Sequence, residues 1–349
     1  MQAEQASITR LNAVNLATYI LNVIVTYGSQ AGWFGATNKE QSLKYQTLAT
    51  PIGFAFAICM PCMARISVFT RHASLVTIVR SLVTIGGPIF MLQAVFAVVQ
   101  LLPKFRADSV VTNGVSYWYV AVCTAQAGWT IAFAQDVVWL SMVFMLFILA
   151  SLGLLVRSVT VVAEAQPEST LCYTCFRAPF LLHLGWITAA SFVNANTCVV
   201  AYAGADTSLQ LGAAIATLAL LLLPGLVNPA TTTRACTADP LYSSVLVWAF
   251  FGVYSELQGE LQGGLHAWCP LLVQRALSGV AALMAAGLSA VVMMRLLWRA
   301  GAAAGLGGER AKTGSAGSLE AQGSPVYPAF VARSESLSEH KPREAEGSL

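Results

Sequence analysis

Long apolar runs, separated by short polar segments, make up most of the chain. Because about 20 helical residues cross a bilayer core, uncharged apolar runs near that length predict membrane-spanning helices. Eight runs qualify with some tolerance: 11–27, 88–102, 115–134, 137–156, 179–201, 211–227, 241–254 and 276–294. The seventh run is short and ends at Glu256, which makes it the weakest of the set. The pattern predicts an all-α, polytopic transmembrane helical bundle.

Two of these runs carry aromatic and amide side chains at helical spacing, in steps of three and four residues. On the third run this face comprises Trp118, Val122, Gln126, Trp129 and Phe133. On the fifth run it comprises His183, Trp186, Ala190, Asn194 and Thr197. Because an amide is costly in contact with lipid, both faces are expected to point into the helix bundle.

Composition supports a membrane protein and excludes several other classes. Hydrophobic residues make up 56% of the 349 residues and charged residues only 10%, against roughly 25% charged residues in an ordinary soluble domain. The net charge of +3 is scattered, so no basic patch predicts a nucleic-acid partner. Eight cysteines are present, and the two Cys-x-x-Cys pairs lie in an apolar stretch and a short loop. We interpret them as small buried apolar side chains rather than as zinc ligands, and we predict no metal site.

Catalytic patterns are also missing from the sequence. It contains no nucleophile elbow, no His-Glu-x-x-His and no phosphate-binding loop. The titratable residues in or beside the spans are Asp136, His183 and Glu256, which lie far apart in sequence. Acid and base chemistry needs such groups within reach of one another. We therefore predict that the protein is not an enzyme.

The basic residues beside the runs predict the topology. With eight spans, one side carries Arg10, Lys104, Arg106, Arg157, Arg177, Arg234, Arg295 and Arg299. The other side carries Lys39, Lys44 and Arg275. Because cytoplasmic loops carry an excess of Lys and Arg, both termini are expected on the cytosolic side of a multi-pass protein.

Residues 59–86 do not fit this plan. They carry three arginines, and a ninth crossing here would move Arg10 to the side opposite the later positive loops. Without them, Thr50-Pro-Ile-Gly-Phe-Ala-Phe-Ala-Ile would lead directly into Gly87-Pro-Ile-Phe, which reads as one uninterrupted helix.

The genetic code offers a specific explanation for this segment. Cys59-Met60 can be encoded with a splice donor, T|GTATG, and Ile85-Gly86 with a splice acceptor, ATAG|GG. Splicing there would leave TGG, a Trp codon. We predict that 59–86 is a retained intron, and transcript reads that all keep the segment would contradict this. A true re-entrant or surface insertion is the alternative.

Three stretches resemble the tryptophan-rich sensory protein family (TspO/MBR), which includes the mitochondrial translocator, or peripheral benzodiazepine receptor. The first is the Thr50 stretch continued at Gly87-Pro-Ile-Phe, similar to the start of the family's second helix. The second is Trp118 to Phe133 with the following span, similar to its third and fourth helices. The third is Trp186-Ile-Thr-Ala-Ala-Ser-Phe-Val-Asn194, similar to its fifth helix.

The resemblance implies a domain organisation. Residues 1–203 would form a TspO-like five-helix membrane domain, with 59–86 as the suspected insertion, and residues 204–299 would add about three transmembrane helices. From Ala300 the composition changes to Gly, Ala, Ser, Glu, Lys and Pro, which predicts a disordered tail over 300–349.

The resemblance also implies a ligand. The family binds tetrapyrroles such as protoporphyrin or haem, and sterols, in an aromatic cavity among its helices, and has been given sensory and transport roles. On this basis the ligand-binding candidates are Trp118, Gln126, Trp129, His183, Trp186 and Asn194. Indole faces stack on a flat apolar ring system while amides fix its polar edge. A tetrapyrrole would be a ligand here, and no cofactor is required.

Simpler roles remain open for the same side chains. Trp118 could anchor its helix at the membrane surface, and Asn194 or His183 could form structural hydrogen bonds to neighbouring helices. The alternative function is a secondary transporter of an unrelated small molecule, although no internal repeat is visible. Porphyrin breakdown, proposed for the family, is the sole argument for an enzyme. The expected partners are the lipid bilayer and a small lipophilic ligand, with a homodimer as a further option.

Overall fold

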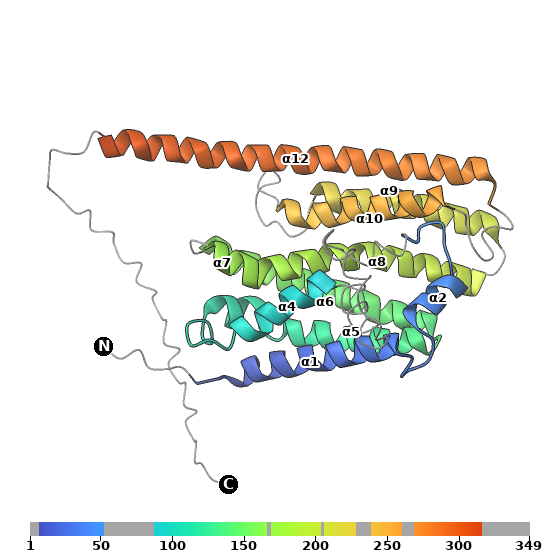
Figure 1. Ribbon diagram of the computed structural model, residues 1–349, viewed down its shortest axis with the longest axis horizontal. Helices are drawn as coiled ribbons and strands as arrows, with labels where there is room; N and C mark the ends of the chain where they lie inside the picture. The colour runs from blue at the N-terminus through green and yellow to red at the C-terminus, as the bar shows by residue number, and fades with distance from the viewer. Residues whose placement is uncertain are drawn as a thin grey trace, which may run out of the picture. The chain divides into compact units, whose positions relative to one another are not determined.

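The computed structural model describes residues 7–51, 87–165, 169–203, 206–227, 239–259 and 269–315. The described residues are mostly helical and include no strand, which confirms the predicted all-α bundle (Figure 1). The α-helices are α1 (Arg10–Gln30), α2 (Asn38–Lys44), α4 (Gly87–Val99), α5 (Trp118–Ala134), α6 (Val138–Ala165), α7 (Thr170–Cys172), α8 (Ala178–Ala203), α9 (Thr207–Val227), α10 (Pro240–Gln258) and α12 (Leu271–Ser315). Two short π-helices, η3 (Val110–Val115) and η4 (Tyr173–Arg177), precede α5 and α8.

A helix occupies each of the eight predicted apolar runs. Five segments are long and apolar enough to cross a membrane: α1, α6, residues 170–202, α9 and α12 up to Gly301. Helices α4 and α5 have 13 and 17 residues, and α10, the weakest prediction, has 19. The long apolar helices make the chain an integral, multi-pass membrane protein.

Consecutive long helices run in alternating directions, so the bundle has two distinct ends (Figure 1). One end, called here the arginine end, carries Arg157, Arg177, Arg295 and Arg299. The opposite end, called the α2 end, carries α2 and the connection between α5 and α6. This arrangement follows the division of basic residues that the sequence predicts, while the cytosolic location of the arginine end stays a prediction.

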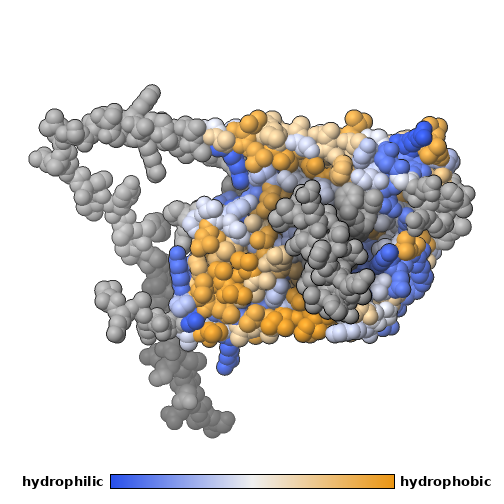
Figure 2. Space-filling model, in the orientation of Figure 1, coloured by the Kyte–Doolittle hydropathy of each residue, from blue (hydrophilic) through white to orange (hydrophobic). Residues whose placement is uncertain are grey.

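The core lies where α5, α6 and α8 pack against one another and against α1 and α4. Its largest buried side chains include Phe96 of α4, Tyr119 of α5 and Phe180 of α8. The Phe96 ring meets Tyr119 edge-on at 5.0 Å and Phe180 at 5.1 Å, which is the geometry that aromatic pairs prefer. On the face that Figure 2 shows, apolar residues cover the middle of the bundle and hydrophilic residues gather toward its ends. Such a surface suits a lipid environment.

Helix α2 and the residue that follows it are fixed to the corner between α5 and α6. Lys44 pairs with Asp136, and the Tyr45 hydroxyl donates to the same carboxylate at 2.9 Å. Gln41 donates to the Phe133 carbonyl oxygen at 3.0 Å, which satisfies a carbonyl at the end of α5. The hydrogen bond from Lys44 lowers the pKa of Asp136, and the same bond raises the pKa of Lys44.

Two predictions concern parts of the chain that the structure describes only partly or not at all, the segment 59–86 and the C-terminal tail. The segment 59–86, predicted to be a retained intron, lies outside them. Helix α12 continues to Ser315, while the disordered tail predicted over 300–349 stays a prediction. The last turns of α12 contain Ala, Glu, Arg and Lys, which are strong helix formers. Residues 1–301 form one compact unit and 302–349 a second, while the division at residue 203 stays a prediction.

Candidate functional site

Trp129 and Asn194 bring two of the predicted site residues together. The indole Nε1–H of Trp129 on α5 donates to the Asn194 amide oxygen on α8 at 3.4 Å. Ser141 of α6 joins them, because its hydroxyl lies 3.4 Å from the same oxygen and 3.3 Å from the Asn194 amide nitrogen. Asn194 and Ser141 are both buried. Three helices therefore share one small polar centre beside an indole ring.

One face of the indole next to this centre is covered by an aromatic side chain. Phe133, one turn after Trp129, stacks on the indole with 5.2 Å between ring centroids and 12° between planes. Gly128, the residue before Trp129, leaves room for Phe144 of α6, and a Cβ atom at Gly128 would lie 2.6 Å from that ring. The missing side chain at Gly128 thus lets α5 and α6 approach closely beside this turn.

Gln126 lies one turn before Trp129 and faces α1. Its amide oxygen accepts a hydrogen bond from Asn22 at 3.2 Å, and Thr26 lies 3.4 Å from the Asn22 oxygen. Asn22 is fully buried. The amide of Gln126 is therefore satisfied by a neighbouring helix, as a polar group among membrane helices requires.

His183 belongs to a different polar group on the other side of the core. Its Nδ1 atom lies 2.9 Å from the Gln93 amide nitrogen of α4, and the Tyr119 hydroxyl donates to the Gln93 oxygen at 3.1 Å. All three side chains are buried. This chain of hydrogen bonds links α4, α5 and α8, and it occupies one ring nitrogen of His183.

The two remaining predicted residues lie outside these polar groups. Trp118, in the first turn of α5, is 38% exposed on the outer surface. That position suits an interfacial anchor. Trp186 is half-buried and packs against the hydrophobic core. The structure thus joins Trp129 directly to Asn194, while Gln126 and His183 contact other polar partners and Trp118 lies at the outer surface.

Several members of these polar groups were not among the sequence candidates. Asn22, Gln93 and Ser141 each contact a predicted residue, and Tyr119 contacts Gln93. A sequence signal existed on α1, where buried polar and tyrosyl positions recur in steps of three and four. These are Asn12, Asn15, Tyr19, Asn22, Thr26 and Ser29. Such a stripe marks an inward face as clearly as the stripe on α5 does.

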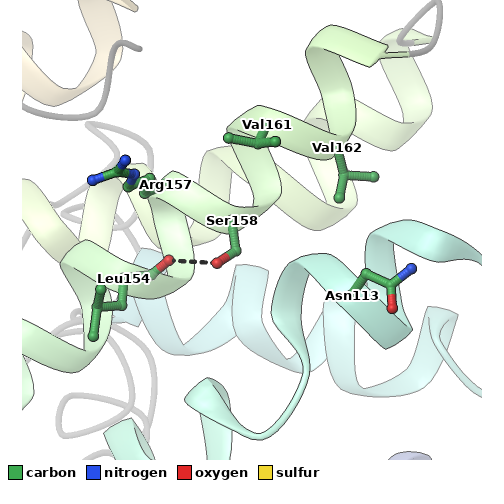
Figure 3. Close-up of a pocket in the computed structure, with 6 residues that line it drawn as sticks. All are labelled: Asn113, Leu154, Arg157, Ser158, Val161 and Val162. Atoms are coloured by element: carbon green, nitrogen blue, oxygen red, sulfur yellow. Dashed lines mark hydrogen bonds between the residues drawn. The ribbon is translucent and has the colours of Figure 1, made fainter. Parts of the chain in front are cut away.

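A pocket of about 420 Å³ lies apart from the Trp129 centre, between η3 and α6 near the arginine end (Figure 3). Its lining combines polar and apolar side chains: Asn113, Leu154, Arg157, Ser158, Val161 and Val162. None of the predicted ligand-binding residues lines this pocket. Within the described residues, no group of three or more His, Cys, Asp or Glu side chains is placed to hold a metal ion.

A family model described as TSPO-like protein matches residues 63–294, which is more than half of the chain. The chain belongs to the TSPO-like protein family. The match begins inside the segment 59–86 and continues through α9 and α10 into α12. It therefore extends well beyond residue 203, where the resemblance placed the end of the TspO-like domain, and does not include α1 or α2. Comparisons with curated proteins and with solved structures find no match.

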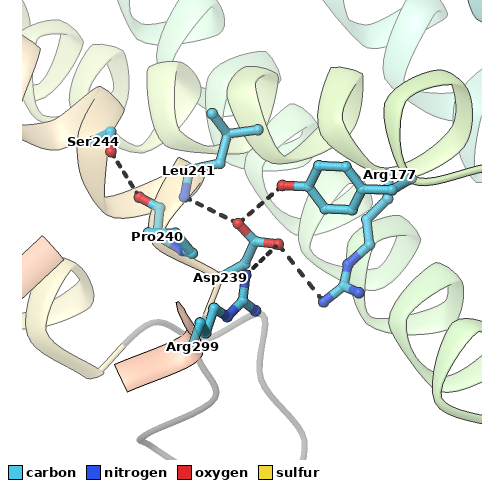
Figure 4. A network of polar contacts seen from close by, with 7 residues as sticks. Arg177, Asp239, Pro240, Leu241, Ser244 and Arg299 are labelled. Atoms are coloured by element: carbon cyan, nitrogen blue, oxygen red, sulfur yellow. Dashed lines mark hydrogen bonds and ion pairs between the residues drawn. The ribbon is translucent and has the colours of Figure 1, made fainter. Parts of the chain in front are cut away.

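The added helices of this TSPO-like protein are tied to the rest of the bundle by a buried carboxylate, Asp239 (Figure 4). Its Oδ1 atom accepts hydrogen bonds from the Tyr173 hydroxyl at 3.1 Å and the Leu241 amide at 3.0 Å. Its Oδ2 atom faces Arg177 at 4.0 Å and Arg299 at 3.9 Å. One side chain therefore caps α10 and joins it to η4 and α12.

A third arginine completes the connection between α9, α10 and α12. Arg295 is buried, and its guanidinium donates to the Gly225 carbonyl at 3.3 Å, to the Leu226 carbonyl, and to the Ser243 hydroxyl at 2.9 Å. The two carbonyls belong to the last turn of α9. Carbonyl groups in the last turn of a helix have no N–H partner within the helix. Polar contacts at the arginine end thus hold the three later helices together.

Proposed function

We propose that this TSPO-like protein binds a flat lipophilic ligand, such as a tetrapyrrole or a sterol-like molecule, beside Trp129, and serves a sensory or transport role. The observation that carries the proposal is the Trp129 centre itself. One indole there offers a stacking face toward Phe133 and a polar edge toward Asn194. A flat ligand with a polar rim needs both features at one place.

Binding would require the two stacked rings to separate. Trp129 and Phe133 are 5.2 Å apart, whereas a ligand between two rings needs about 7–8 Å, twice the optimal carbon–carbon separation of roughly 3.5–4 Å. Phe133 lies at the end of α5, beside the α2 end of the bundle. Rotation of its side chain would expose the indole face, and the ligand would then take the place of the phenyl ring.

The amides around Trp129 would orient the ligand. Asn194 and Ser141 present an amide and a hydroxyl at the indole edge, where carboxylates or a hydroxyl of the ligand would find donors. An iron bond to His183 is not part of the proposal, because that ring is buried against Gln93. A metal-free porphyrin therefore tests the site as well as haem does.

The test is an equilibrium titration of the purified full-length protein with protoporphyrin, followed through porphyrin absorbance, with a sterol as competitor. Trp129→Phe keeps a ring but removes the hydrogen bond to Asn194, and we expect about fivefold weaker binding, the weight of one ordinary hydrogen bond. Trp298→Phe is the matched control, because Trp298 is half exposed on α12 and should leave the affinity unchanged.

Two outcomes would contradict the proposal. A flat titration with folded protein would show that no porphyrin site exists. Equal losses in Trp129→Phe and Trp298→Phe would place binding elsewhere. Competition by the sterol would identify a shared site, and flux measurements in proteoliposomes would separate a transport role from a sensory one.

A further inference from the structure

The pocket between η3 and α6 has two kinds of lining. Arg157, Ser158 and Asn113 provide a cation, a hydroxyl and an amide, while Leu154, Val161 and Val162 provide apolar walls (Figure 3). Leu154 and Val161 are 44% and 51% exposed, so the apolar walls face outward. A ligand that fits must combine an anionic or polar group with a hydrocarbon part.

The depth of the pocket along α6 matches a membrane surface. Arg157 lies nineteen residues after Val138, which corresponds to about 29 Å at a rise of 1.5 Å per residue. The hydrocarbon core of a bilayer is about 30 Å thick. Since α6 begins at the α2 end, the Arg157 guanidinium lies at the level of lipid headgroups on the opposite surface, with Leu154 on the hydrocarbon side.

The backbone on the η3 side of the pocket has an unusual and well-packed form. A π-helix such as η3 is rare and occurs often at functional sites. Gly114 packs directly on α6, where a Cβ atom would lie 3.3 Å from the Val159 Cα atom. Ser116 ends the element with a φ of 47°, a conformation that non-glycine residues seldom adopt. These features hold Asn113 opposite α6 and keep the pocket open.

Arg157 is available for an anion. In the part of the chain that the structure describes, no carboxylate lies within ion-pair distance of its guanidinium. The Asn113 amide lies on the other side of the pocket, next to Val162 (Figure 3). The Ser158 hydroxyl donates to the Leu154 carbonyl at 2.9 Å, so its oxygen is left to accept a hydrogen bond.

We infer that this pocket binds an anionic phospholipid of the surrounding bilayer. The phosphate would contact Arg157, a headgroup hydroxyl would donate to Ser158, and one acyl chain would lie along Leu154 and Val161. The charge of Arg157, which no carboxylate of the described residues pairs, selects an anionic headgroup over a zwitterionic one. This site is independent of the ligand proposed for Trp129.

The experiment is native mass spectrometry of the full chain released from nanodiscs that contain equal amounts of phosphatidylglycerol and phosphatidylcholine with identical acyl chains. The wild-type protein should retain phosphatidylglycerol preferentially. Arg157→Gln should reduce this preference about fivefold, the weight of one arginine near a headgroup. Arg10→Gln is the matched control, since Arg10 is exposed at the start of α1 on the same end of the bundle and should leave the preference unchanged.

A second variant tests the pocket rather than the charge. Val161→Trp keeps Arg157 but fills the apolar wall, and it should reduce retention of phosphatidylglycerol by a similar factor. Inorganic phosphate at millimolar concentration should not displace the lipid, because it lacks the hydrocarbon part. Equal retention of the two lipids by the wild type, or an unchanged preference in both Arg157→Gln and Val161→Trp, would overturn the inference.

Discussion

Replacement of Asp239 by Asn should destabilise the folded protein strongly although it changes only one atom. Asn keeps an oxygen in the position of Oδ1, so the hydrogen bonds from Tyr173 and Leu241 can remain. It removes the negative charge that faces Arg177 and Arg299. The perturbation therefore isolates the ionic part of this contact.

The magnitude follows from the burial of each partner. The side chains of Asp239 and Arg177 are 1% and 13% exposed, and breaking a buried ion pair from one side costs about 3–5 kcal/mol. The 4.0 Å separation is long for an ion pair, which favours the lower limit of about 3 kcal/mol. Arg299 is 38% exposed, so its pair adds at most about 1 kcal/mol. We expect Asp239→Asn to cost about 3–4 kcal/mol.

The assay is reversible unfolding in mixed micelles, with the helical signal followed as denaturing detergent increases. Asp239→Ala should cost about 1 kcal/mol more than Asp239→Asn, because it also removes the cap of α10. Arg299→Gln should cost less than about 1 kcal/mol. The ionic argument is refuted if the free energy of unfolding of Asp239→Asn lies within about 0.5 kcal/mol of the wild-type value, the typical effect of a surface substitution. The charge of Asp239 would then contribute nothing to stability.

Two further predictions concern packing and pH. Gly185→Ala should destabilise by about 1–3 kcal/mol, because its Cβ atom would lie 2.8 Å from the Val245 Cβ. Gly153→Ala, with no atom within 4 Å of the new Cβ, should be neutral or slightly stabilising in the same unfolding assay, and equal effects would contradict the packing argument. The folded pKa of Asp136 is lowered by Lys44, so its stabilisation should be complete above the unfolded value of about 3.9 and disappear as the pH falls through the folded pKa. Limited proteolysis at α2 should therefore accelerate below about pH 4 in the wild type and not in Asp136→Asn, and an acceleration that already begins near pH 6 would assign the effect to another group.

The helices could be predicted from the sequence because membrane spans depend on local composition. Each predicted run contains a helix, including 241–254, where Asp239 caps the helix and Pro240 starts it. The ends were less accurate. Helix α6 continues to Ala165, beyond the predicted end at residue 156 and past Arg157, because a charged side chain at a bilayer surface does not interrupt a helix and can remain in contact with water.

The site was predicted in part, because a helical stripe indicates which residues share a face but not which residues they meet. Val122 and Phe133 of the α5 stripe are buried, and Trp129 and Gln126 contact other helices. Trp118 is exposed although it lies within about 20° of Trp129 around the helix axis, because it stands in the first turn of α5, where the helix begins. The partner Ser141 on α6 carries no distinctive spacing, and only the packing of α6 against α8 brings it to Asn194.

The polar stripe of α1 bears on how the protein is inserted during synthesis. Three fully buried asparagines lie on this helix, at positions 12, 15 and 22, and its mean hydropathy is 1.2 against 2.4 for α6. Lipid alone offers these amides no partners, whereas Gln100 and Gln126 later accept from two of them. We therefore expect α1 to be only weakly stable in the bilayer during synthesis. It should become stably inserted after Gln100 and Gln126, more than eighty positions downstream, have been synthesised.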